Sequence, residues 1–234
     1  MFDEPVEAVI FDMDGLLIDT EAVYIKAYRA GAAIMGVELP LALCHSMIGT
    51  PSPECDRLIQ DFFGPAFRLD DFNGHVDGHA ARLLEAGVPV KAGAVELLGF
   101  LGERGLPLAI ATSSSRRTTE RHLGRAGLLG HFRALATRDD VLRGKPHPDI
   151  HLEAARRLGV APERCIAFED SNTGLAAAHA AGTMAIMVPD IVAPTDESRG
   201  KCLAVLPDLH AAVGLLRTKL LSDLPPTSCG SYRK

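Results

Sequence analysis

The first residues able to do chemistry follow a short apolar run near the N-terminus. Val9-Ile10-Phe11 leads directly into Asp12 and Asp14, and Gly15 comes next. Side chains at positions i and i+2 of an extended segment point the same way, so the two carboxylates can converge on one point. Ligands of open α/β sheets bind at the carboxyl ends of strands. The pair therefore predicts a binding site, and the alternative is a polar strand end before a turn.

A second pair of acidic residues follows another apolar run. Residues 165–168 lead into Glu169 and Asp170, and Ser171 precedes a helical stretch. Clustered carboxylates repel one another unless a cation lies between them, and a set of oxygen ligands suits Mg²⁺ better than Zn²⁺. Asp170 and Ser171 could instead serve as a helix N-cap. That alternative does not account for two acidic strand ends in one chain, so the sequence predicts a magnesium site.

Hydroxyl and basic groups suited to a phosphate follow elsewhere in the chain. Residues 112–115 are four consecutive hydroxyl side chains between an apolar run and a helical stretch. Hydroxyls and free N–H groups at a helix start bind phosphoryl oxygens. Lys145 lies between Gly144 and Pro146, where it can neutralise a carboxylate and a phosphoryl group together. Taken singly, the first feature is typical of a helix N-cap and the second of a solvated loop.

The elements that must position these residues alternate along the chain. Apolar runs without polar alternation are typical of parallel strands covered on both faces, and helical patterns lie between them. This alternation predicts an α/β fold with a doubly wound parallel-sheet (Rossmann-like) core. The expected strands are residues 7–11, 106–111, 134–137, 165–168, 185–188 and 204–206, and the expected core helices are residues 94–104, 115–126, 149–158, 173–181 and 209–216.

One region breaks this alternation. Residues 21–86 carry three amphipathic helical patterns, at 21–35, 52–63 and 71–86, and no convincing strand. A polar tail with Pro and Gly closes the chain. We expect a Rossmann-like core at residues 1–18 and 88–221, an inserted all-helical cap domain at residues 19–87 and a flexible C-terminal tail at residues 222–234.

Composition narrows the class of protein. Hydrophobic residues make up 47% and charged residues 23% of the 234 residues, which excludes a disordered, collagen-like or coiled-coil chain. With 24 basic and 30 acidic residues the net charge is −6, which argues against a nucleic-acid partner. Five scattered cysteines predict neither disulfides nor a zinc site. Without a signal peptide or a membrane-spanning run, we expect a cytoplasmic protein, monomeric in the simplest case, with no membrane partner.

Together these motifs resemble the haloacid dehalogenase (HAD) superfamily. Asp12-x-Asp14-Gly15 looks like its first motif, Thr112 like its second, Lys145 like its third and Glu169-Asp170 like its fourth, in the family's order. The closest likeness is to the subgroup of β-phosphoglucomutase and pseudouridine-5′-phosphatase, whose members carry a helical cap after the first motif. Residues 91–93, Lys-Ala-Gly, depart from the Pro-Gly pair common among relatives at the return from cap to core.

The resemblance implies a Mg²⁺-dependent phosphomonoesterase that acts on a small phosphorylated metabolite, such as a sugar, polyol or nucleoside phosphate. Asp12 would be the nucleophile that becomes an aspartyl-phosphate, and Asp14 the general acid and base. The implied ligands of Mg²⁺ are Asp12, the main-chain carbonyl of Asp14, and Asp170, while Glu169 would orient water or Lys145. Thr112, Ser113 and Lys145 would hold the phosphoryl oxygens, and Thr20, Glu21 and Gly49 would meet the substrate.

Two other functions remain open at this point. A sugar phosphomutase of the β-phosphoglucomutase type carries an arginine in the cap loop for a second phosphate, but here none follows Gly49 until Arg57, which favours hydrolysis. A non-catalytic binding protein on the same fold would require a missing motif residue, and none is missing. His147 and His151 are expected on a solvated helix surface.

Overall fold

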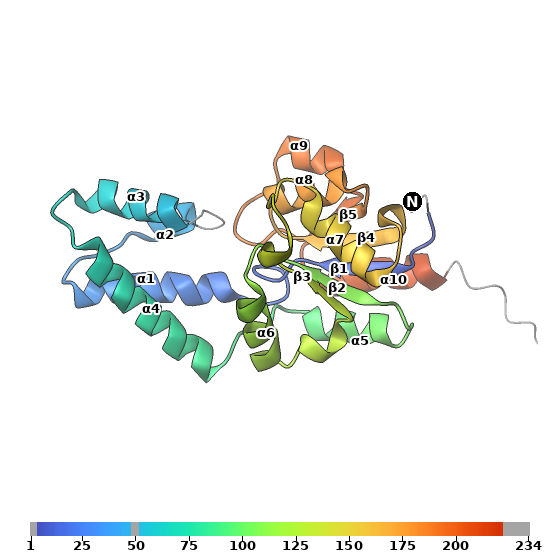
Figure 1. The fold of residues 1–234 in the computed structure, drawn as a ribbon, viewed down its shortest axis with the longest axis horizontal. Coiled ribbons are helices and arrows are strands. Elements are labelled where there is room, and N and C mark those ends of the chain that lie inside the picture. The colour runs from blue at the N-terminus through green and yellow to red at the C-terminus, as the bar shows by residue number, and fades with distance from the viewer. Residues whose placement is uncertain (1–3, 48–51, 222–234) are drawn as a thin grey trace, which may run out of the picture.

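A parallel sheet flanked by helices and a separate group of helices beyond the carboxyl ends of its strands make up the molecule (Figure 1). The computed structural model describes residues 4–47 and 52–221. Gly49 and the expected tail at residues 222–234 lie outside the described residues. The strands are β1 (Ala8–Phe11), β2 (Leu108–Ala111), β3 (Ala134–Ala136), β4 (Cys165–Glu169), β5 (Met184–Met187) and β6 (Ala204–Val205).

The sheet order confirms the predicted doubly wound core. The strands pair in parallel in the order β3-β2-β1-β4-β5-β6, and each expected strand segment overlaps one of them. β1 and β4 are neighbours, with Phe11 opposite Phe168. The chain winds outward from this pair in both directions, so their carboxyl ends flank the switch point at which ligands of such sheets bind.

The two faces of the sheet carry side chains of different size. On one face, bulky residues such as Phe11 and Phe168 pack against α5 (Ala94–Gly102), α6 (Arg116–Arg125) and α10 (Leu209–Leu221). On the other face, alanines such as Ala109 and Ala167 meet α7 (Asp149–Leu158) and α8 (Asn172–Ala180). Small side chains let these two helices approach the strands closely. All five expected core helices are present, and α9 (Asp196–Lys201) is an additional one.

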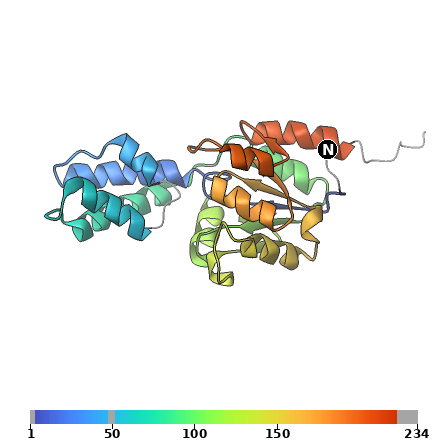
Figure 2. The same cartoon turned by 90° about the horizontal axis from the view of Figure 1, so that it is seen from above.

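The inserted residues form a helical unit, defined as α1 (Thr20–Ile34), α2 (Leu41–Ser46), α3 (Ser52–Phe63) and α4 (Leu69–Ala86) (Figure 2). Sequence patterns predicted three of these helices and missed α2, which has only six residues. The unit has its own apolar core around Ile59 and Phe72. A Cβ at Gly31 would lie 2.9 Å from a methyl carbon of Val76, so this glycine lets α1 and α4 pack together.

The two connections between the helical unit and the sheet run side by side. The amide of Asp19 donates to the carbonyl of Pro89 (2.9 Å), and the amide of Lys91 donates to the carbonyl of Leu17 (2.9 Å). Ile18 and Val90 form an antiparallel bridge between them. Paired backbone segments resist independent movement, so the helical unit is held on a two-stranded connection.

Candidate active site

The acidic residues of both motifs meet at the carboxyl ends of β1 and β4. The amide of Asp12 donates to the carbonyl of Phe168 (3.0 Å), which places Asp12 beside the end of β4. Carboxylate oxygens of Asp12, Glu169 and Asp170 lie within 4.8 Å of one another. The structure therefore brings Asp12 together with Glu169 and Asp170, while the carboxylate of Asp14 is not part of this cluster.

Lys145 lies between two of these carboxylates. Its Nζ atom is 2.5 Å from Oδ1 of Asp12 and 2.6 Å from Oε1 of Glu169, and all three side chains are buried. Burial would lower the pKa of Lys145, but the two carboxylates outweigh it and raise that pKa. Lys145 in turn holds the pKa of Glu169 below its usual value against the effect of burial. The lysine is therefore a buried cation poised beside Asp12.

The environment of Asp12 and Asp170 destabilises the ionised form of both carboxyl groups. Burial raises the pKa of Asp12 to about 7 despite the nearby lysine. Burial and the charges of Asp12 and Glu169 also raise the pKa of Asp170 well above its usual value. One lysine is thus insufficient to neutralise the cluster. Oxygen ligands with surplus negative charge fit a hard divalent cation, which Asp12 and Asp170 would hold together.

Gly15 makes room for this cluster. Its φ of +82° is left-handed, and a Cβ at this position would lie 2.2 Å from Oδ2 of Asp170. Only glycine combines that conformation with that contact. The tight turn after β1 and the placement of Asp170 therefore depend on the same residue.

Asp14 is oriented by two hydroxyl groups from different parts of the fold. Thr20, at the start of α1, donates to Oδ1 of Asp14 (2.6 Å), and Ser114, after β2, donates to Oδ2 (2.8 Å). Thr20 was expected to meet the substrate, whereas here it holds Asp14. The role of Ser114 escaped sequence reasoning because three consecutive serines gave no reason to single it out.

The other hydroxyl residues after β2 lie close by. Thr112 is buried at the strand end, where its hydroxyl accepts from the amide of Ser114 (3.1 Å). Ser113 is exposed. Ser115 caps α6 by accepting from the amide of Thr118 (3.3 Å). The hydroxyl run thus provides a helix cap and, at the carboxyl edge of the sheet, groups able to receive a phosphoryl group.

A second group of charged residues borders the site. Lys91 Nζ lies 2.5 Å from Oδ1 of Asp190. This ion pair joins the segment that leads from the helical unit back to the sheet with the loop after β5. Glu21, in the first turn of α1, lies beside Asp190. Burial and the charge of Asp190 raise the pKa of Glu21 to about 7. Lys91 therefore supplies a cation next to the site.

The expectation of a solvated surface is wrong for His151. This side chain is fully buried on α7, and its Nε2 lies 2.9 Å from Oε1 of Glu169. Its position could have been found, because His151, Ala154, Ala155 and Leu158 form an i, i+3, i+4, i+7 stripe facing the sheet. His147 is exposed, as expected.

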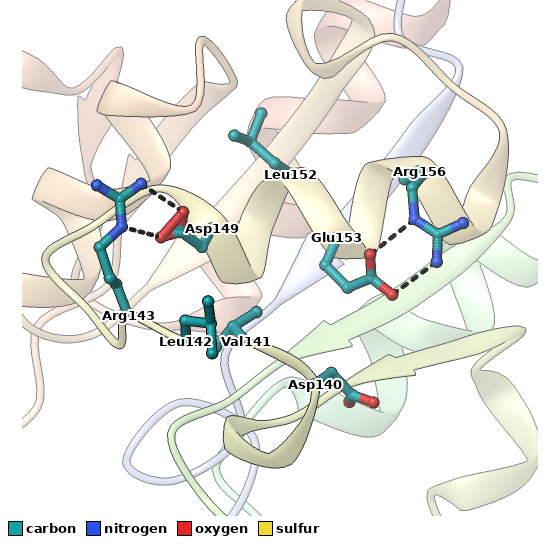
Figure 3. A pocket seen from close by; sticks show the side chains of 8 residues that line it. All are labelled: Asp140, Val141, Leu142, Arg143, Asp149, Leu152, Glu153 and Arg156. Atoms are coloured by element: carbon teal, nitrogen blue, oxygen red, sulfur yellow. Dashed lines mark hydrogen bonds and ion pairs between the residues drawn. The ribbon is translucent and has the colours of Figure 1, made fainter.

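Ion pairs on the outer side of α7 fix the loop that carries Lys145. Arg143 makes two contacts with Asp149, at 2.8 and 2.7 Å, across the loop. Asp140 pairs with Arg157 at 2.7 Å. A pocket on this side is lined by Arg143, which pairs with Asp149, and by Arg156, which pairs with Glu153 (2.7 Å), and none of the clustered carboxylates lines it (Figure 3). This pocket lies between the loop and α7 and is separate from the candidate site.

Comparison with known proteins identifies the family. The family model of the haloacid dehalogenase-like hydrolases matches residues 6–182. The chain belongs to this family. As a HAD-like hydrolase, it is 36% identical over 177 residues to the phosphorylated carbohydrates phosphatase of Thermotoga maritima, covering 76% of this chain and 82% of that protein.

Solved structures agree with this assignment. A HAD family hydrolase from Deinococcus radiodurans R1, with bound phosphate and sodium, matches this HAD-like hydrolase with a TM-score of 0.81 and 29% identity over 93% of this chain and 98% of that one. A Thermotoga maritima structure provisionally described as a β-phosphoglucomutase matches with a TM-score of 0.80 and 31% identity over 91% and 99%. The predicted family and fold are confirmed, and the relatives support a phosphatase. No helix in the described part of the chain is long and apolar enough to cross a membrane.

Proposed function

We propose that this HAD-like hydrolase is a Mg²⁺-dependent phosphomonoesterase for small phosphorylated carbohydrates. The observation that carries the proposal is the buried cluster of Asp12, Lys145, Glu169 and Asp170, in which one cation faces three carboxylates. Such a cluster provides a nucleophile, a cation for a phosphoryl oxygen and a place for a metal within one site.

Asp12 is the nucleophile in this proposal. Its carboxylate attacks phosphorus to form an aspartyl-phosphate, which splits one difficult displacement into two easier ones. Lys145 lies 2.5 Å from this carboxylate and stabilises the charge on the transferring phosphoryl group. Thr112 and Ser113 supply further donors at the end of β2.

Asp14 is the general acid and then the general base. The hydroxyls of Thr20 and Ser114 fix its carboxyl group, so it can protonate the leaving oxygen and afterwards accept a proton from the attacking water. Asp12, Asp170 and the main-chain carbonyl of Asp14 would hold Mg²⁺. A divalent cation bound there supplies charge that offsets the repulsion between carboxylate and phosphate.

The border of the site favours a substrate rich in hydroxyl groups. Oε2 of Glu21 and Oδ2 of Asp190 are buried carboxylate oxygens that accept from no other group of the described structure, apart from a proton that the two carboxyl groups can share. Buried acceptors require donors, and the hydroxyls of a sugar or polyol can provide them. The relative from Thermotoga maritima acts, by its name, on phosphorylated carbohydrates. The helical unit is then the cap that covers this substrate.

The test is phosphate release from a panel of sugar, polyol and nucleoside phosphates with an aryl phosphate as reference, in Mg²⁺ and in EDTA. We expect release with Mg²⁺, loss in EDTA and recovery when Mg²⁺ is added back. Asp12→Asn should abolish turnover while leaving the far-UV circular dichroism spectrum, and so the fold, nearly unchanged. No release from any compound would contradict the proposal, and transfer between two sugar positions without release would identify a mutase.

A further inference from the structure

His151 occupies a place behind the candidate site where a histidine is costly. Its side chain is fully buried, and its Nδ1 atom has no hydrogen-bond partner in the described structure. Burial lowers the pKa of His151, so the imidazole is neutral near pH 7 and carries one N–H group. A buried polar group without a bond costs free energy, so an apolar residue would serve packing better.

The one polar group within reach of this ring, among the described residues, is Glu169. Nε2 of His151 lies 2.9 Å from Oε1 of Glu169, the oxygen that also faces Lys145 at 2.6 Å. Glu169 is fully buried, so water cannot replace either contact. On the other side, a Cβ at Gly174 would lie only 1.9 Å from Oε2 of Glu169, so backbone confines the second oxygen.

We propose that His151 is a positioning residue that donates its Nε2–H to Glu169 and thereby sets how strongly Glu169 draws Lys145 away from Asp12. With two donors on Oε1, the carboxylate shares its charge, and Lys145 can remain near the nucleophile. Without His151, Lys145 is the sole partner of that oxygen and moves toward Glu169. This inference rests on the proposed role of Lys145 in phosphoryl binding.

Two substitutions separate this role from packing. His151→Phe keeps a ring of similar size without a donor, whereas His151→Gln places an amide N–H near the position of Nε2. We expect His151→Phe to lower kcat at least tenfold and to weaken binding of inorganic phosphate in Mg²⁺, measured by calorimetry. His151→Gln should recover both to within threefold of wild type. A packing role predicts the reverse order, with Phe the better replacement.

A control comes from the second buried histidine. His122 on α6 is also buried, and neither of its nitrogens has a partner among the described residues. His122→Phe should leave the affinity for inorganic phosphate within twofold of wild type, because no hydrogen bond joins this imidazole to Glu169 or Lys145 in the described structure and Asp14 acts on it only as a nearby charge. A His151→Phe variant with wild-type kcat and phosphate affinity would overturn the inference.

A measurement on the unmodified protein covers the case in which His151→Phe does not fold. Long-range ¹H–¹⁵N spectra of histidine-labelled protein report which ring nitrogen carries the proton. The proposal requires the Nε2–H tautomer at His151, and an Nδ1–H tautomer would refute it. This result does not depend on turnover, whereas wild-type protein inactive on every phosphate would contradict the proposed function instead.

Discussion

Gly174→Ala offers a test in which the structure reverses an ordinary expectation. Gly174 is the third residue of α8, and replacing glycine by alanine in a helix normally stabilises by about 1 kcal/mol. Here the new Cβ would lie 1.9 Å from Oε2 and 2.5 Å from the carboxyl carbon of Glu169. Nonbonded carbon contacts need roughly 3.5 Å, so the carboxylate must withdraw by more than about 1 Å.

That withdrawal would break the contact between Glu169 and Lys145. Separating a buried ion pair costs about 3–5 kcal/mol, so after the helical gain we expect a net loss of about 2–4 kcal/mol. For a chain of this size the melting temperature should fall by roughly 5–10 °C. Because Lys145 loses one of the two carboxylates that fix its position, kcat for an aryl phosphate should fall as well.

Gly99→Ala is the matched control. Gly99 lies in the middle of α5 and is exposed, and nothing lies within 4 Å of the position that a Cβ would take there. This variant should melt at a slightly higher temperature with unchanged kcat, as helix propensity predicts. If Gly174→Ala behaved like Gly99→Ala, the tight enclosure of Glu169 would be refuted.

Three further predictions follow from groups around the site. In EDTA, Glu21→Gln should raise the melting temperature more at pH 8 than at pH 5. Burial raises the pKa of this carboxyl group to about 7, so ionisation of Glu21 above that pH weakens the folded state. Equal increases in melting temperature at the two pH values would contradict this reasoning. Asp140→Asn should lower the free energy of unfolding by about 2–3 kcal/mol at pH 7, measured by urea unfolding. Hydrogen bonds and ion pairs hold the pKa of Asp140 low, and wild type loses this stabilisation when the carboxylate is protonated. The difference in stability between variant and wild type should therefore shrink below about pH 4. Thr20→Val should lower kcat several-fold with little change in KM, because Asp14 loses a 2.6 Å hydrogen bond. An unchanged kcat in steady-state assays would show that this hydrogen bond does not orient Asp14.

The sequence predicted the sheet and its acidic edge because both depend on local patterns. Apolar runs ending in Asp12 and Glu169 mark strands whose carboxyl ends must meet in a doubly wound sheet. Partners that depend on the path of the chain could not be predicted in this way. The pairing of Asp14 with Ser114 joins residues 100 positions apart, and the contact of Lys91 with Asp190 joins residues 99 positions apart.

His151 is a different case, because the signal was present in the sequence. The apolar stripe of α7 includes this position, but a histidine so soon after a proline loop is more typical of a surface. Its burial follows from the small residues of the facing sheet, which only the assembled core reveals. Short elements such as α2 escaped prediction because six residues give too few turns for a periodic pattern.

The unequal faces of the sheet give the two sides of this protein different tolerance to mutation. Enlarging Ala109 or Ala167 would push α7 outward, and with it the loop of Lys145, so such variants should lose turnover before they lose folding. Trimming Phe11 or Phe168 on the opposite face would leave cavities under α5 and α10, so those variants should lose stability first. A mutational scan that scores abundance and turnover separately should therefore divide the sheet residues by alternate positions along each strand.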